Sequence, residues 1–290
     1  MPTDETSPDA SRSGTFLIGG DLPVRRLGFG AMRITGAGVW GPPADRDEAV
    51  AVVRRAVELG TTLIDTADSY GPEISEEIIG EALSPYPDDV VIATKAGWTR
   101  PAPGVWDPMG RPDHIRTACE GSLRRLRLDT IPLFQLHTPD PEVPIEESVG
   151  AIVDLQTEGK VRAIGLSNVG VDDLIRAQAL TPIVTVQNRF NLVDRSSADV
   201  LAACQDEGIG FIPWAPLAVG DLDAARRALA GPTERLGASE GQVALAWLLA
   251  HSPVMLPIPG TGSVAHLDEN VAAAGLELTA DEQAALDAAV

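Results

Sequence analysis

The stretch TTLIDTADSYG, residues 61–71, joins a buried apolar segment to a cluster of chemically active side chains. Its first half is apolar and β-branched, which is typical of a strand that is covered on both faces. Asp65, Asp68 and Tyr70 then follow within six residues. Tyr70 is one of only two tyrosines in the chain, so its place beside two carboxylates needs a chemical reason.

Seven other segments have the same short, apolar, strand-like character. Together with the first, they lie at 26–32, 61–66, 90–95, 131–137, 161–168, 183–188, 209–217 and 254–260. Amphipathic stretches separate them, most clearly at 47–60, 114–128, 145–160 and 241–252. This alternation predicts a single-domain α/β fold, a (β/α)8 TIM barrel. A doubly wound sheet is the alternative, but Gly28-x-Gly30 lacks the third glycine of a dinucleotide-binding turn.

The chain ends and the longer connections carry further predictions. Residues 1–14 are polar and acidic and predict a disordered leader, with the barrel over 15–290. A β-hairpin over 11–24 is expected to precede the first barrel strand. The connections 96–112 and 218–238 are longer than a barrel needs, and the second has room for an extra helix. Capping boxes predict helix starts at Ser239-x-x-Gln242 and at Thr279-x-x-Glu282, the latter opening a last helix.

Composition disfavours several classes of function. The formal net charge is −20, so the chain lacks the basic footprint that nucleic acid or an anionic membrane surface requires. No apolar run approaches the roughly 18 to 20 residues of a membrane span. Cys119 and Cys204 lie far apart in helical patterns, which favours buried free thiols in a reducing compartment. We therefore expect a cytoplasmic protein that acts on a small molecule, as a monomer or small homo-oligomer.

Active side chains end consecutive predicted strands. Asp65 ends the second, Lys95 the third and His137 the fourth, and Tyr70 lies in the loop after Asp65. Strand ends of a barrel meet at one mouth, so these four side chains are expected to converge. A lysine ammonium at ~4 Å, at an effective dielectric constant of ~20, favours the phenolate by ~4 kcal/mol before any cost of desolvation. Asp65 would keep Lys95 charged, and His137 would donate a hydrogen bond to a substrate oxygen.

These groups together suit protonation of an alkoxide that forms from a carbonyl, with an external hydride donor. Each has a plainer interpretation alone: Asp65 as a helix cap, Lys95 as the partner of another acid, and His137 as a core histidine. Their shared position at consecutive strand ends favours catalysis. A metal site of Asp65, Asp68 and His137 is disfavoured, because no second histidine stands at ligand spacing and Lys95 would repel the ion.

The later strand ends carry groups that suit a nucleotide. Ser167 and Asn168 end the fifth strand and Gln187 ends the sixth; these neutral hydrogen-bonding groups suit a carboxamide. Trp214 ends the seventh strand and offers a flat face for stacking. The eighth strand runs into PGTGS, 259–263, a glycine-rich turn that suits a phosphate site or an ordinary connection.

Three of the five tryptophans, Trp40, Trp98 and Trp106, fall in the loops after the first and third strands. Aromatic residues make up only 4% of the chain, so this grouping predicts an apolar wall for a substrate pocket. Packing on the surface is the alternative for each of them.

The sequence resembles the aldo-keto reductase superfamily. The resemblance rests on DTADSYG (65–71), the strand that ends in Lys95, FQLH (134–137), GLSN (165–168), VQNRFN (186–191), WAPL (214–217) and IPGTGSVAHLDEN (258–270), in order along nearly the whole chain. It implies a (β/α)8 barrel and the reversible, NADPH-dependent reduction of aldehydes or ketones. It also implies that Tyr70 is the general acid and that Asp65, Lys95 and His137 complete a tetrad.

The resemblance also implies a set of cofactor contacts. Ser167, Asn168 and Gln187 match the residues that hold the nicotinamide carboxamide, and Trp214 matches an aromatic that stacks on the nicotinamide. Leu217, Gly260, Thr261 and Asn270 match positions along the pyrophosphate and adenosine. Many members place basic residues after the eighth strand against the 2′-phosphate of NADPH, where this chain has Thr261, Ser263 and His266. These bind a phosphate more weakly than arginine, which leaves NADH use open.

Both ends of the barrel resemble a bacterial branch that includes pyridoxal reductases, also called pyridoxine 4-dehydrogenases. The stretches are GAMRITGAGVWGPPADRDEA (30–49) and PGTGSVAHLDENVAA (259–273). Pyridoxal is therefore one expected substrate, and a general reductase of small aldehydes is the main alternative. Two other classes stay open: a non-catalytic nicotinamide-nucleotide sensor, and an aldolase-type barrel in which Lys95 forms a Schiff base.

Overall fold

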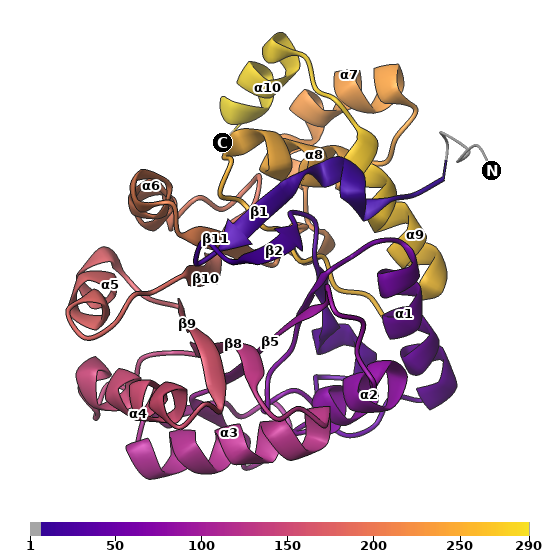
Figure 1. Ribbon diagram of the computed structural model, residues 1–290. Helices are drawn as coiled ribbons and strands as arrows, with labels where there is room; N and C mark the ends of the chain where they lie inside the picture. Colours follow the sequence, from indigo (N-terminus) through magenta and orange to yellow (C-terminus); the bar gives the residue numbers. More distant parts are fainter. Residues whose placement is uncertain (1–6, 290) are drawn as a thin grey trace.

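Parallel strands curl into a barrel in the computed structural model of the protein, which describes residues 7–289 (Figure 1). In sheet order these strands are β3 (Phe29–Gly30), β4 (Leu63–Asp65), β5 (Val91–Ala96), β8 (Ile131–Leu136), β9 (Val161–Ser167), β10 (Thr185–Arg189) and β11 (Gly210–Trp214). They coincide with the first seven predicted strands. Each is short and mostly buried, because the barrel interior covers one face and helices cover the other.

The eighth predicted strand, 254–260, closes the barrel as an extended segment rather than a regular strand. On one side the Leu256 N–H donates to the carbonyl of Phe211 at 2.8 Å, and on the other the Gly28 N–H donates to the carbonyl of Pro257 at 2.9 Å. Two prolines in this segment have no N–H to donate, so a continuous ladder cannot form. The predicted (β/α)8 barrel is confirmed, with its last strand reduced to these contacts.

Helices alternate with the strands and surround the barrel (Figure 1). They are α1 (Arg46–Glu58), α2 (Ile74–Leu83), α3 (Pro112–Leu126), α4 (Ile145–Thr157), α5 (Val171–Gln178), α6 (Ala198–Glu207), α8 (Glu240–His251) and α9 (Val264–Ala272). The extra helix predicted within 218–238 is α7 (Arg226–Leu236), and α10 (Ala280–Asp287) is the predicted last helix. Both predicted capping boxes are present.

The N-terminal segment packs on the barrel before the predicted boundary. A 3₁₀ turn, Ala10–Ser13, places Ala10 in the core, and its N–H donates to the carbonyl of Leu59 at 2.8 Å. This contact at the end of α1 corrects the expected disordered leader over 1–14, since residues 10–13 are ordered. Residues 1–6 lie outside the described part of the chain.

The predicted hairpin forms from β1 (Thr15–Ile18) and β2 (Leu22–Arg25), which pair antiparallel. Its buried side chains, such as Ile18 and Val24, pack with Leu133 and other inward-facing residues of the barrel strands. The hairpin therefore covers the end of the barrel opposite the mouth. A second hairpin, β6 (Trp98–Thr99) with β7 (Asp107–Pro108), lies in the long connection after β5, where the sequence predicts only a loop.

The barrel interior becomes polar toward the carboxyl ends of the strands. The Thr185 hydroxyl donates to the Gln135 amide oxygen at 3.2 Å in this layer. Gly165 faces Thr185 in the β9–β10 register, and a Cβ at 165 would lie 2.2 Å from the Thr185 hydroxyl oxygen. Glycine at this position therefore makes room for the polar layer.

The polar layer also holds a buried ion pair. Lys95 is fully buried and Asp65 is 2% exposed. The Lys95 ammonium donates to a carboxylate oxygen of Asp65 at 2.7 Å and to the carbonyl of Thr66 at 2.8 Å. The other carboxylate oxygen accepts from the Gln187 amide at 2.8 Å. Both charges are therefore satisfied inside the barrel, as burial requires.

Gly165→Ala should destabilise the fold by about 1–3 kcal/mol, because the added methyl overpacks the Thr185 layer. Denaturant unfolding followed by circular dichroism measures this. Gly150→Ala is the matched control: it lies in α4 with open space around its Cβ position. It should stabilise by about 0.5–1 kcal/mol through helix propensity. Equal effects of the two variants would contradict the crowding argument.

Lys95→Met should destabilise the protein by about 3–5 kcal/mol, because it leaves the Asp65 carboxylate buried without its countercharge. The double variant Asp65→Asn with Lys95→Met should recover much of that loss, which a double-mutant cycle of unfolding free energies measures. Lys160→Met is the control, since Lys160 is the only other lysine and lies at the surface. Additive effects of the two substitutions in the barrel would show that the charges are not coupled.

Candidate active site

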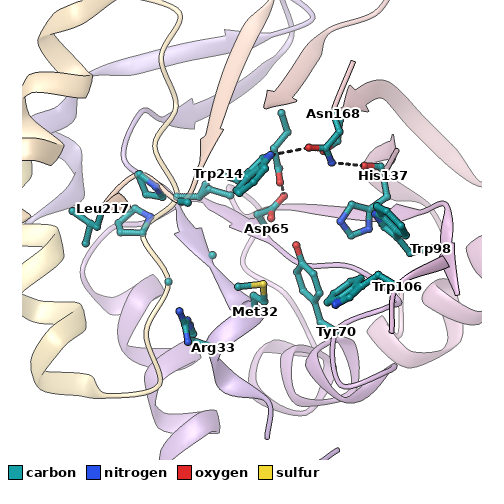
Figure 2. A pocket seen from close by; sticks show the side chains of 18 residues that line it. Met32, Arg33, Asp65, Tyr70, Trp98, Trp106, His137, Asn168, Trp214 and Leu217 are labelled. Atoms are coloured by element: carbon teal, nitrogen blue, oxygen red, sulfur yellow. Dashed lines mark hydrogen bonds between the residues drawn. The ribbon is translucent and has the colours of Figure 1, made fainter. Parts of the chain in front are cut away.

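A cavity of about 500 Å³ opens at the carboxyl ends of the strands (Figure 2). Most of the side chains that the sequence singles out line it: Asp65, Tyr70, Trp98, Trp106, His137, Ser167, Asn168, Gln187, Trp214, Leu217 and Gly260. Lys95 does not line the cavity; it lies behind Asp65 and contacts its carboxylate. The structure therefore brings the side chains at the strand ends together at this mouth, as expected.

Tyr70 lies between the buried ion pair and the cavity. Its side chain is 7% exposed, and the Lys95 ammonium nitrogen lies 5.2 Å from the centre of its ring. The ring of His137 meets it edge-on, with 5.7 Å between the ring centres. In Figure 2 the Tyr70 hydroxyl extends into the space between Asp65, Met32 and His137. A phenol and an imidazole thus face the same part of the cavity.

Burial decides the protonation state of Tyr70. Desolvation raises the pKa of this phenol above its ordinary value, and the opposing effect of Lys95 is smaller. The sequence-based expectation that Lys95 favours the phenolate holds for that single interaction, but the net shift has the opposite sign. Tyr70 is therefore protonated at neutral pH, which is the form that a general acid requires.

The charge on Lys95 is fixed by its partners. Burial alone acts to lower the pKa of its ammonium, but Asp65 and then Tyr70 oppose this, and the net result is a raised pKa. A Schiff-base lysine must be neutral and must reach its substrate. Lys95 is charged and fully buried, so the geometry is against the aldolase alternative.

His137 is neutral. Burial, and then the nearby positive charge of Lys95, hold the pKa of its imidazole well below the ordinary value. The backbone carbonyl of His137 accepts from the Asn168 side-chain amide at 2.9 Å, which fixes the end of β8 against β9. A neutral imidazole can donate one hydrogen bond to a polarised carbonyl oxygen without adding a second positive charge to the site.

The neutral trio predicted for a carboxamide lies on the other wall of the cavity. Asn168 adopts a left-handed backbone conformation, with φ of 59°, and its side-chain oxygen accepts from the Trp214 indole N–H at 3.0 Å. The Gln187 amide nitrogen is bonded to Asp65, while its amide oxygen accepts no hydrogen bond from any residue within 7–289. The Ser167 hydroxyl oxygen accepts from the Asn168 side-chain amide at 3.2 Å and keeps its own hydrogen to donate. Ser167 as donor and the Gln187 amide oxygen as acceptor therefore lie beside a held indole ring, an arrangement that fits a nicotinamide carboxamide.

The phosphate end of the predicted cofactor site is only partly at the cavity. Thr261, Ser263, His266 and Asn270 do not line it, although they follow Gly260 closely in sequence. A Cβ at Gly260 would lie 2.6 Å from the carbonyl oxygen of Gly30, so close contact between β3 and the closing segment requires this glycine. The Val264 N–H at the start of α9 already donates to the Glu48 carboxylate at 3.1 Å.

The aromatic wall consists of Trp98 and Trp106 but not Trp40. The two indoles meet edge-on, 6.0 Å apart, and Trp106 also meets Tyr70 edge-on at 6.5 Å. The guanidinium of Arg100 lies 3.6 Å from the Trp106 ring centre and 5.5 Å from that of Trp40. Trp40, which the sequence predicts in the pocket wall, does not line this cavity and instead lies on the far side of Arg100.

Sequence reasoning missed Met32 and Arg33, which line the cavity opposite the aromatic wall (Figure 2). They follow Gly28-x-Gly30, a pattern weighed only as an incomplete dinucleotide turn. Arg33 is exposed and has no hydrogen-bond or ion-pair partner among residues 7–289. The sequence carries only a weak signal for Arg33, an arginine directly after the first predicted strand in a chain of net charge −20.

Four other observations concern the rest of the described chain. Asp68 does not line the cavity, and burial, followed by the charge of Glu76, raises its pKa well above the ordinary value. Cys119 and Cys204 are buried free thiols as predicted, and burial raises the pKa of each to about 12. Within residues 7–289, no three His, Cys, Asp or Glu side chains are grouped to hold a metal ion. Over the same residues, no helix has both the length and the apolarity to span a membrane.

Comparison with known proteins matches this geometry to one family. Residues 26–290 match the Aldo/keto reductase family. The chain is 42% identical to pyridoxine 4-dehydrogenase of Escherichia coli, over 95% of this chain and 98% of that one. It is 48% identical to an uncharacterized oxidoreductase of Schizosaccharomyces pombe, over 96% of this chain and 90% of that one.

A solved structure of an aldo/keto reductase has the same fold as this chain. The aldo/keto reductase from Klebsiella pneumoniae, determined in complex with NADP and acetate, superposes with a TM-score of 0.79 at 30% identity, over 94% of each chain. The match to the family covers residues 26–290, which include the strand ends that build the mouth, and the match in structure covers 94% of the chain. This chain belongs to the aldo/keto reductase family.

Proposed function

We propose that the protein is an oxidoreductase that reduces an aldehyde to an alcohol with NADPH, and that Tyr70 is its general acid. The observation that carries the proposal is a phenol and an imidazole that meet at the cavity in front of the buried Lys95–Asp65 pair. Burial raises the pKa of the phenol and lowers that of the imidazole, which favours the uncharged form of both. The complexes of relatives with NADP support the cofactor. The free thiols Cys119 and Cys204 support a reducing compartment such as the cytoplasm.

Bound NADPH would supply the hydride that adds to the carbonyl carbon. Tyr70 donates its proton to the carbonyl oxygen, so that the products are an alcohol and a tyrosine phenolate. Lys95 stabilises that phenolate because its positive charge lies beside the ring, and Asp65 keeps Lys95 in place. His137 orients the carbonyl oxygen by hydrogen bonding. The reverse reaction starts from the phenolate as general base.

The aromatic wall favours a flat substrate. Trp98, Trp106, Tyr70 and His137 form a series of edge-to-face contacts, which leaves planar ring surfaces beside the phenol. A planar aromatic aldehyde fits such a wall better than a branched sugar. Pyridoxal has this shape, and the similarity to pyridoxine 4-dehydrogenase of E. coli supports it as the substrate. A general reductase of small aldehydes is the broader form of the proposal.

Arg33 is the basic group that supports binding of the cofactor phosphates. It lines the cavity beside Gly260, and its charge is not neutralised by any residue within 7–289. The start of α9 is less suited to a phosphate, since the Glu48 carboxylate occupies its first free N–H. This arrangement supports an anion contact on the β3 side of the mouth instead of the predicted one after the eighth strand. A comparison of the affinities for NADPH and NADH therefore tests whether Arg33 contacts a cofactor phosphate.

Tyr70→Phe should lower the rate of NADPH-dependent pyridoxal reduction by about 10²- to 10⁴-fold, the usual contribution of a general acid. The affinity for NADPH, measured by the quenching of tryptophan fluorescence, should stay the same. In the wild type the reduction rate should be flat from neutral pH upward and fall only above the ordinary tyrosine pKa of 10.0, because the raised pKa keeps the acid protonated. Absorbance of the reduced nicotinamide measures the rate of the variant and the pH dependence of the wild type.

Tyr86→Phe is the matched control for this experiment. The Tyr86 hydroxyl donates to the carbonyl of Leu126 at 2.6 Å, away from the cavity, so its loss should leave turnover unchanged. Near-full activity of Tyr70→Phe would overturn the acid assignment. Tight NADPH binding without turnover of pyridoxal or any simple aldehyde would indicate a nucleotide sensor instead.

Arg33→Met should weaken NADPH binding by about tenfold at low salt, as expected for the loss of a charged contact. The difference from the wild type should shrink as salt increases, because exposed charges are screened. Fluorescence titrations with NADPH and NADH at two salt concentrations measure this. Arg54→Met, at the surface on α1, is the control. Unchanged affinity for both nucleotides in Arg33→Met would remove Arg33 from the binding site.

A further inference from the structure

Ser69 makes a contact with the catalytic set that the proposed mechanism does not use. Its hydroxyl oxygen lies 3.3 Å from Nδ1 of His137. Both residues are buried, with exposures of 2% and 7%. The Arg100 guanidinium donates to the Ser69 carbonyl at 3.0 Å, so the backbone that carries this hydroxyl is itself held. The contact joins the loop after β4 to the end of β8.

The protonation state of His137 makes this contact consequential. A neutral imidazole carries its proton on only one of two nitrogens, and the hydrogen bond at one nitrogen decides the state of the other. Burial and Lys95 keep His137 neutral, so its tautomer is a real variable of the site. With the proton on Nε2, the ring is a donor on that side; with the proton on Nδ1, Nε2 is an acceptor.

The surroundings of Ser69 choose between the two tautomers. Within 7–289, its hydroxyl has no hydrogen-bond partner other than Nδ1 of His137. If Nδ1 donated, the hydroxyl hydrogen would be buried without an acceptor, which is costly. If the hydroxyl donates to Nδ1, both groups are satisfied and the proton lies on Nε2. Nε2 itself is bonded to no residue in that range, and His137 lines the cavity.

We propose that Ser69 is a positioning residue that donates to Nδ1 of His137 and thereby fixes the Nε2–H tautomer. Its role in turnover rests on the proposed carbonyl reduction. A carbonyl oxygen in the cavity accepts from the Tyr70 hydroxyl and from Nε2–H together. In the other tautomer the lone pair of Nε2 would face the lone pairs of that oxygen and repel it. Ser69 therefore decides whether His137 attracts or repels the group to be reduced.

Nitrogen NMR of the full-length protein, labelled at histidine with ¹⁵N, tests the tautomer without any substrate. The chain has four histidines, so the His137 signals can be assigned by their loss in His137→Ala. In the wild type, Nε2 should carry the proton and Nδ1 should not. In Ser69→Ala, the signals should shift toward a mixture of the two tautomers. A wild type protonated on Nδ1, or an unchanged tautomer in Ser69→Ala, overturns the proposal.

Kinetics of the same variants complete the test. Ser69→Ala should lower kcat for pyridoxal by about 3- to 10-fold, as expected for the loss of one neutral hydrogen bond, and leave NADPH affinity unchanged. Ser148→Ala is the matched control, because it removes another fully buried hydroxyl, bonded to the carbonyl of Gly110 at 2.6 Å. It should change neither kcat nor the tautomer, and an equal loss of kcat there would overturn the specific role of Ser69. A wild type with the Nε2–H tautomer that reduces no aldehyde supports the tautomer assignment and overturns the proposed reduction.

Discussion

The ion pair of Lys95 with Asp65 is the interaction on which the rest of the site depends. A charged lysine inside a barrel is tolerated only with a countercharge and full hydrogen bonding. Asp65 comes from the neighbouring strand β4, and Gln187 from β10 across the interior donates to the same carboxylate. Closure of the barrel therefore holds the pair together, and the pair holds one fixed positive charge behind the cavity.

That single charge sets the behaviour of its neighbours. It helps to keep His137 neutral, and it opposes the effect of burial on Tyr70. Around the phenol, the result is one buried cation paired with Asp65 and two uncharged donors, arranged before any substrate arrives. Such an arrangement stabilises negative charge that develops on an oxygen, at no cost of reorganisation during the reaction.

Sequence reasoning was strongest where side chains follow regular strands. The ends of β4, β5 and β8 predict the meeting of Asp65, Lys95 and His137, because parallel strands of a barrel share one mouth. It was weakest where contacts cross the fold. The position of Trp40 depends on Arg100, 60 positions away, and the pKa of Tyr70 depends on how deeply it is buried. Neither the position of Trp40 nor the pKa of Tyr70 can be inferred from the spacing of residues along the chain.

The segment 254–260 makes one side of the barrel less densely hydrogen-bonded than the other. Between β4 and β10 the strands are joined by continuous ladders, whereas this segment is held to its neighbours by a few separate bonds and carries prolines. Local opening concentrates where backbone bonds are sparse. The tetrad therefore sits on the stiff half of the ring. Ile258, Pro259 and Gly260 line the cavity from this seam, so any local opening there would change the cavity wall without breaking the ladders that carry Asp65, Lys95 and His137.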